Sequence, residues 1–303
     1  MRQSVVAIDL GGTKLASAAV DTAGQISLHT KREAKRGDPR ASVQQIVEVF
    51  RETIAGVDLN GRSVLGLGVL VPGVYFADSG NAWAPNLWRH EQVPLRAELE
   101  RELDVPVVID SDRAGYVTGE RWLGAAKGLT EVVFLAVGTG IGAGIVARGQ
   151  LLRGVDDVAG AVGWFALNPD AKDLYKHIGC WEAEAAGPAL ARRGNASSAE
   201  DVITAARKSH PAAQDAVRQT AKYLGMGIAN IVSLLNPEMI VLGGGLMRSA
   251  DLFIDSIKRE VAEWAQPIAA QRVRVVTTKL GEDAGLLGAA RLTFDRLSIE
   301  VNH

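Results

Sequence analysis

An acidic residue and a glycine-rich turn follow the first apolar stretch of the chain. Residues 5–8 are Val-Val-Ala-Ile and predict a buried strand, Asp9 follows it, and residues 11–14 are Gly-Gly-Thr-Lys. Glycine lets backbone N–H groups approach phosphate oxygens, because no Cβ stands in the way. A carboxylate beside such a turn suits hydrated Mg²⁺, which prefers oxygen ligands. The segment predicts that Asp9 holds Mg²⁺ through water and that the turn binds phosphate, with a structural turn as the alternative. The predicted nucleotide ligands are Gly11, Gly12, Thr13 and Lys14.

A second copy of this pattern begins near residue 132. Residues 132–140 resemble residues 5–13, and the next turns, 20–26 and 146–151, also resemble each other. This repeat predicts a duplicated fold in which each half opens with a strand, a glycine turn and a second strand. Two facing copies would place glycine turns on opposite sides of one cleft, where they would grip a polyphosphate from both ends. Gly138, Thr139 and Gly140 are therefore predicted to bind nucleotide, with two unrelated hairpins as the alternative.

A third glycine segment follows the strand predicted over residues 239–242. Gly243, Gly244 and Gly245 form a junction without side chains between that strand and the next helix. A flat adenine or a ribose can lie against such bare backbone. We predict that Gly243 and Gly244 bind nucleotide, with a tight structural corner as the alternative.

Two carboxylates stand at the end of the strand predicted over residues 105–109. On a continuing strand, Asp110 and Asp112 would face the same side. A carboxylate in the cleft can accept the proton of a hydroxyl that attacks a phosphoryl group. Asp112 is the predicted general base. A surface pair in a turn is the alternative, and the shared face is lost if the strand ends at Ile109.

The remaining apolar pattern predicts an α/β protein of two lobes. It indicates helices over 42–54, 95–103, 215–235, 251–264 and 282–297, and further strands over 64–71 and 273–276. No linker separates the halves, so topology places the boundary near Arg113. The predicted N-terminal lobe is 1–112 and the C-terminal lobe is 113–290, with the terminal helix 291–303 packed back on the first lobe.

Composition and charge exclude several classes of protein. The chain is 47% hydrophobic and 22% charged, as globular proteins are and disordered or fibrous ones are not. A net charge of −2 gives no positive field, so no nucleic-acid partner is expected. The first apolar run is too short and too polar for a signal peptide or a membrane span, and the single Cys180 allows no intramolecular disulfide. A cytoplasmic protein without a membrane partner is the expectation.

A set of motifs runs in order along nearly the whole chain. Its members are 9–14, Leu-Val-Pro-Gly at 70–73, Pro-Asn-Leu at 85–87, Asp112 with Gly-Glu at 119–120, the turn at 138–142, Gly-Cys-Trp-Glu at 179–182, the glycines at 243–245, and 280–290. Together they resemble the ROK family of bacterial sugar kinases and sugar-responsive repressors. The ordered set is far more specific than any one motif.

The resemblance implies a duplicated actin-like (hexokinase-like) ATPase fold, with two α/β lobes around a cleft, that uses ATP and Mg²⁺ to phosphorylate a sugar hydroxyl. Asp112 matches the family's general base, and Asn86 and Glu182 match sugar-binding positions. Gly73 lies in a matching motif, whereas residues 111–114 read Ser-Asp-Arg-Ala in place of the family's Asn-Asp-Ala-Asn, which keeps the acid but changes its neighbours. Gly73 and Ser111 are both assigned to the substrate site. The family also implies a homodimer or a homotetramer.

The chain departs from the family pattern at residues 161–164. Ala-Val-Gly-Trp stands there in place of the usual Glu-x-Gly-His, so two sugar contacts are lost, at a cost of about 1 to 3 kcal/mol each. Trp164 can offer its ring to the apolar face of a sugar. Alternatively, it can simply fill the space that the family's structural zinc ion would otherwise occupy. We assign Trp164 to the substrate site and expect a sugar other than plain glucose.

The zinc motif of the family is also incomplete. Its C-x-C-G-x-x-G-C-x-E pattern survives only at 179–182, and the earlier cysteine positions fall near Asp173 and Tyr175. A structural zinc ion takes four Cys or His ligands, which Cys180 and His177 alone do not supply. No structural zinc is predicted.

The leading hypothesis is an ATP-dependent carbohydrate kinase that works by in-line phosphoryl transfer. The main rival is a sugar or nucleotide sensor of the same family with weak catalysis, which the altered sugar site permits. A DNA-binding repressor is less favoured, because the first strand begins near Ser4 and leaves no room for a preceding helix-turn-helix. An actin-like or chaperone-like ATPase lacks support from the Asn86 and Glu182 matches.

Overall fold

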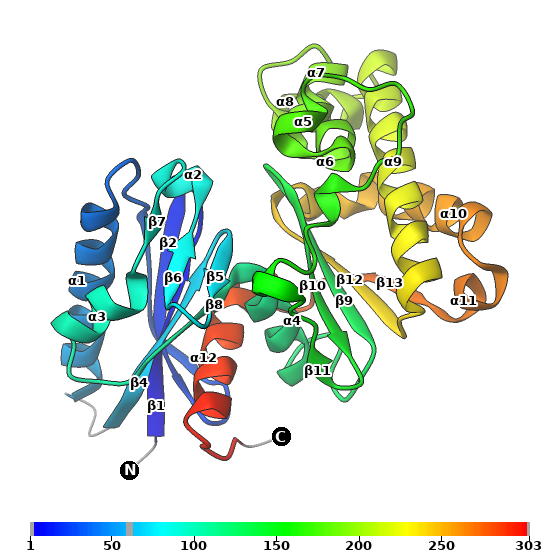
Figure 1. Ribbon diagram of the computed structural model, residues 1–303. Coiled ribbons are helices and arrows are strands. Elements are labelled where there is room, and N and C mark those ends of the chain that lie inside the picture. Colours follow the sequence, from blue (N-terminus) through cyan, green and yellow to red (C-terminus); the bar gives the residue numbers. More distant parts are fainter. Residues whose placement is uncertain (1–2, 59–62, 302–303) are drawn as a thin grey trace. The chain divides into compact units, whose positions relative to one another are not determined.

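The computed structural model describes residues 3–58 and 63–301, which form two compact units. Unit 1 consists of Met1–Gly128, Arg153–Val158 and Lys279–His303, and unit 2 of Leu129–Leu152 and Ala159–Thr278. Each unit is built on its own five-stranded sheet (Figure 1). None of the helices described is long and apolar enough to cross a membrane.

The sheet of unit 1 has the strand order β3-β2-β1-β4-β8. β1 (Gln3–Leu10), β2 (Lys14–Asp21) and β3 (Ile26–Glu33) form an antiparallel meander. β4 (Ser63–Val71) runs parallel to β1, and β8 (Val107–Ser111) runs parallel to β4. The predicted first two strands and their glycine turn are therefore present.

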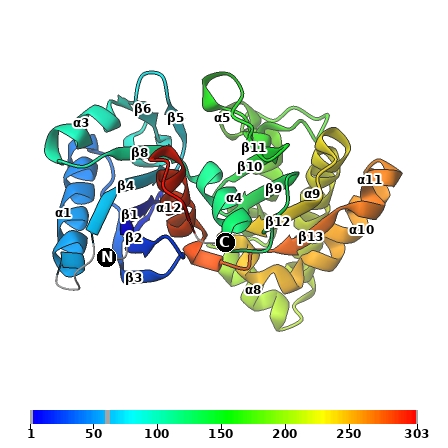
Figure 2. The same ribbon diagram turned by 90° about the horizontal axis from the view of Figure 1, so that it is seen from below.

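Two helices cover opposite faces of this sheet, as Figures 1 and 2 show. Val6, Ile8 and Leu10 pack on the side of α1 (Pro39–Asp58), whereas Val5 and Ala7 pack on the side of α12 (Ala284–Arg296). Because side chains alternate along a strand, Asp9 shares the α12 face with Val5 and Ala7.

Unit 1 contains further short strands and helices besides this sheet, α1 and α12. They are β5 (Val74–Phe76), β6 (Asn81–Trp83), α2 (Pro85–Trp88), β7 (Gln92–Val93), α3 (Leu95–Glu102), α4 (Asp112–Trp122), η1 (Val155–Asp157) and η4 (Gly281–Asp283). Helices α4 and α12 approach very closely, because a Cβ on Gly288 would lie 1.9 Å from Gly115 O. Only glycine allows that approach, which brings the first turn of α4 toward β1.

The sheet of unit 2 repeats that of unit 1. Its order is β11 (Gln150–Leu151), β10 (Ile141–Ala147), β9 (Val132–Val137), β12 (Met239–Gly243) and β13 (Arg274–Thr277). The first three strands are antiparallel and the last two are parallel to β9, as in unit 1. The duplication predicted from residues 5–13 and 132–140 is confirmed.

The helices of unit 2 include the longest helix described. α9 (Pro211–Leu235) starts with proline and ends at Asn236, which adopts a left-handed φ of 46° just before Pro237. It buries Leu224, Ile228 and Val232 in the core of the unit. The others are η2 (Val162–Trp164), α5 (Tyr175–Ile178), α6 (Cys180–Ala185), α7 (Gly187–Arg193), α8 (Ala199–Arg207), η3 (Gly245–Leu252), α10 (Ile254–Trp264) and α11 (Pro267–Arg272).

Two expectations from the sequence need correction. The boundary predicted near Arg113 moves to Gly128, because α4 packs on α12 within unit 1, which also includes residues 153–158 and 279–290. Asp110 and Asp112 do not share a strand face, since β8 ends at Ser111 and Asp112 is the first residue of α4.

Candidate active site

Two carboxylates with raised pKa values lie close together in unit 1. Asp9 packs beneath the start of α12, where a Cβ on Gly285 would lie 2.1 Å from Asp9 Oδ2. Burial and the charge of Asp112 raise the pKa of Asp9 to about 7, against the effect of a hydrogen bond from the Tyr116 hydroxyl. Burial raises the pKa of Asp112 to about 6, against the effects of the charge and backbone N–H of Arg113. The effect of Asp112 on the pKa of Asp9 shows that the two carboxylates are near enough to interact electrostatically.

The Asp9 carboxylate has an unused acceptor. Its Oδ1 is buried and has no hydrogen-bond partner within residues 3–58 and 63–301. A buried carboxylate oxygen is costly unless it meets a cation or a bound water. No group of three or more His, Cys, Asp and Glu side chains placed to hold a metal occurs in the described part of the chain. A single carboxylate with an unused oxygen fits a hydrated Mg²⁺, which takes most of its ligands from water and phosphate, and a magnesium site at Asp9 stays a prediction.

The glycine turn of unit 1 borders a predicted sugar-binding residue. Gly11 N donates to Lys14 O (2.8 Å) and closes the hairpin between β1 and β2. The side chains of Thr13 and Lys14 are exposed. A Cβ on Gly12 would lie 3.5 Å from the Cβ of Asn86, the second residue of α2. The turn and the exposed Asn86 therefore lie side by side in unit 1.

Two other predicted substrate residues hold the start of α4. Ser111 is its N-cap, and the Ser111 hydroxyl accepts a hydrogen bond from Ala114 N (3.3 Å). Arg113 Nη2 donates to Gly73 O (3.2 Å). Contact of Ser111 and Gly73 with a substrate stays a prediction, whereas their part in fixing Asp112 is visible.

The predicted nucleotide segments of unit 2 come together. Gly138 O accepts from Gly187 N (2.7 Å) at the start of α7, and a Cβ on Gly138 would lie 3.6 Å from Gly245 N. Gly244 has a φ of +90°, and a Cβ there would lie 2.5 Å from Val137 O. A side chain is therefore excluded at Gly244 by both conformation and space. The turn after β9 and the junction after β12 form one surface of bare backbone.

Glu182 supports the glycine turn of unit 2. Its Oε2 accepts from Ile141 N (2.8 Å), and a Cβ on Gly140 would lie 2.7 Å from the same oxygen. Burial raises the pKa of Glu182, and the Ile141 N–H opposes that rise. Asn86 and Glu182, both predicted to bind sugar, thus lie in different units, and the sugar contact of Glu182 stays a prediction.

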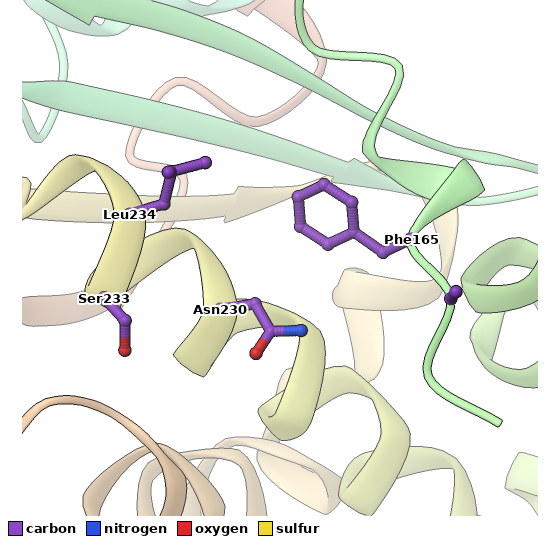
Figure 3. Close-up of a pocket in the computed structure, with 5 residues that line it drawn as sticks. Phe165, Asn230, Ser233 and Leu234 are labelled. Carbon is purple, nitrogen blue, oxygen red and sulfur yellow. The ribbon is translucent and has the colours of Figure 1, made fainter. Parts of the chain in front are cut away.

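Trp164 differs from the tryptophan that follows it in unit 2. It is 57% exposed in η2, whereas Trp181 is fully buried and stacks on Phe165 with 5.8 Å between ring centroids. The cavity beside Phe165 is lined by that ring, Ala166 and three residues of α9, Asn230, Ser233 and Leu234, so none of the predicted site residues lines it (Figure 3). The exposed ring of Trp164 remains available to a ligand.

The region that resembles a zinc motif is held by a charged cluster. Cys180 is buried and its sulfur accepts from Leu167 N (3.4 Å), while His177 is exposed. Buried Glu184 binds Lys172 Nζ (2.6 Å) and Arg193 Nη2 (2.5 Å) and accepts from the Tyr175 hydroxyl; the two cations and the hydroxyl lower its pKa against burial. The absence of zinc stays a prediction.

Four residues of the site were not found from the sequence. Tyr116 follows Asp112 by four residues, a spacing that signals one helix face only after a helix is known to begin at Asp112. Gly285 and Gly288 have helical spacing inside the matched segment 280–290, which was the available signal. Gly187 precedes a proline at a helix start, which was the signal for this fourth residue.

The repeated sheets and glycine turns define a mixed α/β protein with the duplicated actin-like ATPase fold, as predicted. The ROK family model matches residues 5–296, and the chain belongs to the ROK family.

Relatives with known names include both kinases and repressors. A glucokinase of Halalkalibacterium halodurans is 32% identical over 311 residues, covering 95% of this chain and 94% of the relative. A xylose repressor of Bacillus subtilis is 25% identical over 296 residues, covering 96% of this chain and 77% of the repressor. The structure of a ROK family glucokinase from Streptomyces griseus in complex with glucose and AMPPNP has a TM-score of 0.79 at 29% identity and covers 95% of this chain and 98% of that one. Sugar kinase activity is therefore supported at the level of the family.

Proposed function

We propose that this protein is an ATP-dependent carbohydrate kinase that transfers the γ-phosphate to a sugar hydroxyl. The observation that carries the proposal is the coupled pair Asp9 and Asp112, in which one carboxylate has an unused buried oxygen and the other begins a helix. Phosphoryl transfer to an alcohol needs both a cation site and a proton acceptor, and this pair offers the two. The family relationship to glucokinases supports the same assignment.

Asp112 is the general base of the proposed reaction. With a pKa of about 6, its carboxylate is ionised at pH 7 to 8 and still basic enough to accept a hydroxyl proton. Asp9 holds hydrated Mg²⁺ and is oriented by the Tyr116 hydroxyl. Bound Mg²⁺ would neutralise charge on the phosphate oxygens. The proton of the sugar hydroxyl moves to Asp112 as the hydroxyl oxygen attacks the γ-phosphorus, and the bond from that phosphorus to the β–γ bridging oxygen breaks to release ADP.

The nucleotide is bound mainly through backbone groups. Gly11, Gly12, Thr13 and Lys14 in unit 1, and Gly138, Thr139, Gly140, Gly243 and Gly244 in unit 2, are the proposed ligands. The bare surface at Gly138 and Gly244 supports this role, because a side chain at Gly244 would collide with Val137 O. Thr13 and Lys14 are exposed and can donate to phosphate oxygens.

The acceptor is a sugar other than plain glucose. Asn86, Glu182, Gly73 and Ser111 remain the proposed substrate residues, together with the exposed Trp164. An indole face suits an apolar or substituted face of a sugar better than a ring of hydroxyls. A cytoplasmic location and a homodimeric or homotetrameric assembly are proposed from the sequence and the family.

The test is ADP release with a panel of hexoses, amino sugars and deoxysugars, for the wild type and for Asp112→Asn. Loss of a general base lowers kcat by about 10² to 10⁴-fold. Asp295→Asn, an exposed carboxylate on α12, is the matched control and should leave the rate unchanged. Absence of turnover with every sugar, or full activity of Asp112→Asn, would refute the kinase assignment.

A sugar or nucleotide sensor of the same family is the second candidate. The observation that favours it is the pair Ala161 and Trp164, which replaces two family sugar contacts. Calorimetry distinguishes the two functions: a sensor binds sugar or nucleotide but yields no phosphorylated product.

A further inference from the structure

Residues 153–158 form a short strap that belongs to unit 1, although the chain on both sides of it, Leu152 and Ala159, belongs to unit 2. The strap contains η1 and has an unusual backbone. Gly154, Asp156 and Asp157 have φ values of 69°, 56° and 56°. Left-handed conformations cost free energy at residues other than glycine, and they persist where surrounding contacts impose them.

Arg153 attaches the strap to the end of β8. Its guanidinium makes two hydrogen bonds to Asp110, Nη1 to Oδ1 at 3.1 Å and Nη2 to Oδ2 at 2.7 Å. Nη1 also binds Asp157 Oδ1 at 3.1 Å, and Asp157 Oδ2 accepts from Ala77 N at 3.4 Å. The Asp110 side chain is only 8% exposed, so Arg153 neutralises a buried charge in a bidentate pair.

Asp110 connects this pair to the proposed base. Asp110 Oδ1 also accepts from Ser111 N (2.8 Å), Ser111 caps α4, and Asp112 is the first residue of that helix. Every link from the guanidinium to Asp112 is therefore a hydrogen bond or an adjacent residue. Arg113 completes the set by binding Gly73 O, just before β5.

We propose that Arg153 is a positioning residue for phosphoryl transfer, which fixes the Asp110–Ser111–Asp112 segment so that Asp112 meets the acceptor hydroxyl. This inference rests on the proposed kinase function. The guanidinium touches no reacting atom in this scheme. Removing it leaves a buried carboxylate without its cation, which favours a local rearrangement of the segment. A displacement of about 1 Å at a catalytic group is enough to lower the rate about 100-fold.

The test compares Arg153→Gln, Arg153→Lys, Asp110→Asn and the double variant Asp110→Asn/Arg153→Gln with the wild type. We expect Arg153→Gln to lower kcat about 10 to 100-fold while the KM for ATP changes less than about twofold. Arg153→Lys keeps the charge without the bidentate fork and should recover part of the rate. The double variant removes the unpaired charge and should be faster than Arg153→Gln alone, which is the coupling expected of a direct pair.

The matched control is Arg207→Gln, which removes an exposed ion pair with Asp251 in unit 2 (2.8 Å) and should leave kcat unchanged. An activity-independent measurement is hydrogen exchange at Ala114 N, the amide bound by Ser111 Oγ. We expect exchange there to be about tenfold faster in Arg153→Gln and unchanged in Arg207→Gln.

The outcomes separate the two proposals. If the wild type phosphorylates a sugar and Arg153→Gln has wild-type kcat, or if the effects of the two substitutions simply multiply, the positioning role of Arg153 is refuted. If the wild type phosphorylates no sugar, the kinase proposal fails, and so does a role for Arg153 in it. In that case the exchange rate at Ala114 still shows whether the guanidinium fixes the segment.

Discussion

The glycine turns of the two units occupy equivalent places in equivalent sheets, yet they have different chemical surroundings. In unit 1 the turn follows Asp9, whose pKa is raised to about 7. In unit 2 the matching position is Ala136, and the nearby carboxylate is Glu182, which comes from α6 and binds a backbone amide of the turn. One turn is therefore next to an ionisable pair, and the other is next to bare backbone and a structural carboxylate.

The difference shows how a duplicated topology acquires two roles. Strand order and direction fix where each turn lies, and both turns offer backbone amides. The elements packed against each turn decide the chemistry. In unit 1, α12 and α4 bring Gly285, Tyr116 and Asp112 to Asp9. In unit 2, α7 and η3 bring Gly187 and Gly245 to Gly138.

The largest expected effect concerns Asp9, the carboxylate beside the glycine turn of unit 1, which has no counterpart in unit 2. Asp9→Asn removes the carboxylate proposed to hold Mg²⁺, and we expect kcat to fall about 10² to 10³-fold, because the charge stabilisation is worth several kcal/mol. The rate should also lose its dependence on Mg²⁺ concentration near the wild-type midpoint, measured by ADP release. Asp295→Asn serves as the control. If the rate of Asp9→Asn depended on Mg²⁺ concentration as the wild-type rate does, the carboxylate that distinguishes the two turns would have no role in Mg²⁺ binding.

The second effect concerns stability and belongs to unit 2. Gly244→Ala forces a Cβ to 2.5 Å from Val137 O at a φ of +90°, and we expect a loss of about 2 to 4 kcal/mol in unfolding free energy, measured by urea denaturation. Gly245→Ala is the matched control, because, its chain neighbours aside, no atom of residues 3–58 and 63–301 lies within 4 Å of its Cβ position. Gly12→Ala in unit 1 meets only an ordinary 3.5 Å contact and should cost less than about 1 kcal/mol. Equal losses at all three positions would contradict this account.

The third prediction concerns the pH dependence of stability that the two carboxylates of unit 1 produce. Asp9 and Asp112 have pKa values of about 7 and about 6 in the folded protein, above the ordinary aspartate value of 3.8. Between about pH 4 and about pH 7 the folded state therefore binds more protons than the unfolded state. The unfolding free energy of the Mg²⁺-free protein falls as the pH rises through this range, from about 4 to about 7. We expect a loss of about 1 to 4 kcal/mol over this range, measured by urea denaturation in EDTA.

Asp9→Asn should remove much of that decline, because an amide does not titrate. Added Mg²⁺ should stabilise the wild-type protein at pH 8, because the ion binds the ionised site of the folded state and not the unfolded chain. The same pH slope in the wild type and in Asp9→Asn would mean that Asp9 is not the titrating group.

The smallest effect tests the structural carboxylate of unit 2. Glu182→Ala leaves the Ile141 amide without its acceptor and should weaken nucleotide binding by about 1 to 2 kcal/mol, measured by calorimetry. Glu182→Gln keeps a carbonyl acceptor and should cost less than about 1 kcal/mol. Equal losses for Glu182→Gln and Glu182→Ala would indicate that the charge of Glu182, and not its acceptor, matters, because both variants lack that charge.

Local sequence patterns were enough to predict much of the fold and part of the candidate site. The apolar runs before Asp9 and Gly138 predicted two strands with glycine turns, and their similarity predicted the duplication, since burial and turn geometry depend on neighbouring residues. The ordered motifs predicted the family. The same reasoning placed Asp110 beside Asp112 on a strand, because local apolarity does not show where β8 gives way to α4.

The sequence by itself determined the repeated framework, the glycine positions and the identity of the candidate base. Only the tertiary structure decided that Tyr116 and Gly285 meet Asp9, that Arg153 pairs with Asp110 across 43 positions of the chain, and that α4 belongs to unit 1. The reason is physical. Hydrophobic periodicity reports which side of an element is buried, whereas contacts between distant residues depend on how closely whole helices and strands approach, and here glycines on α4 and α12 set that distance.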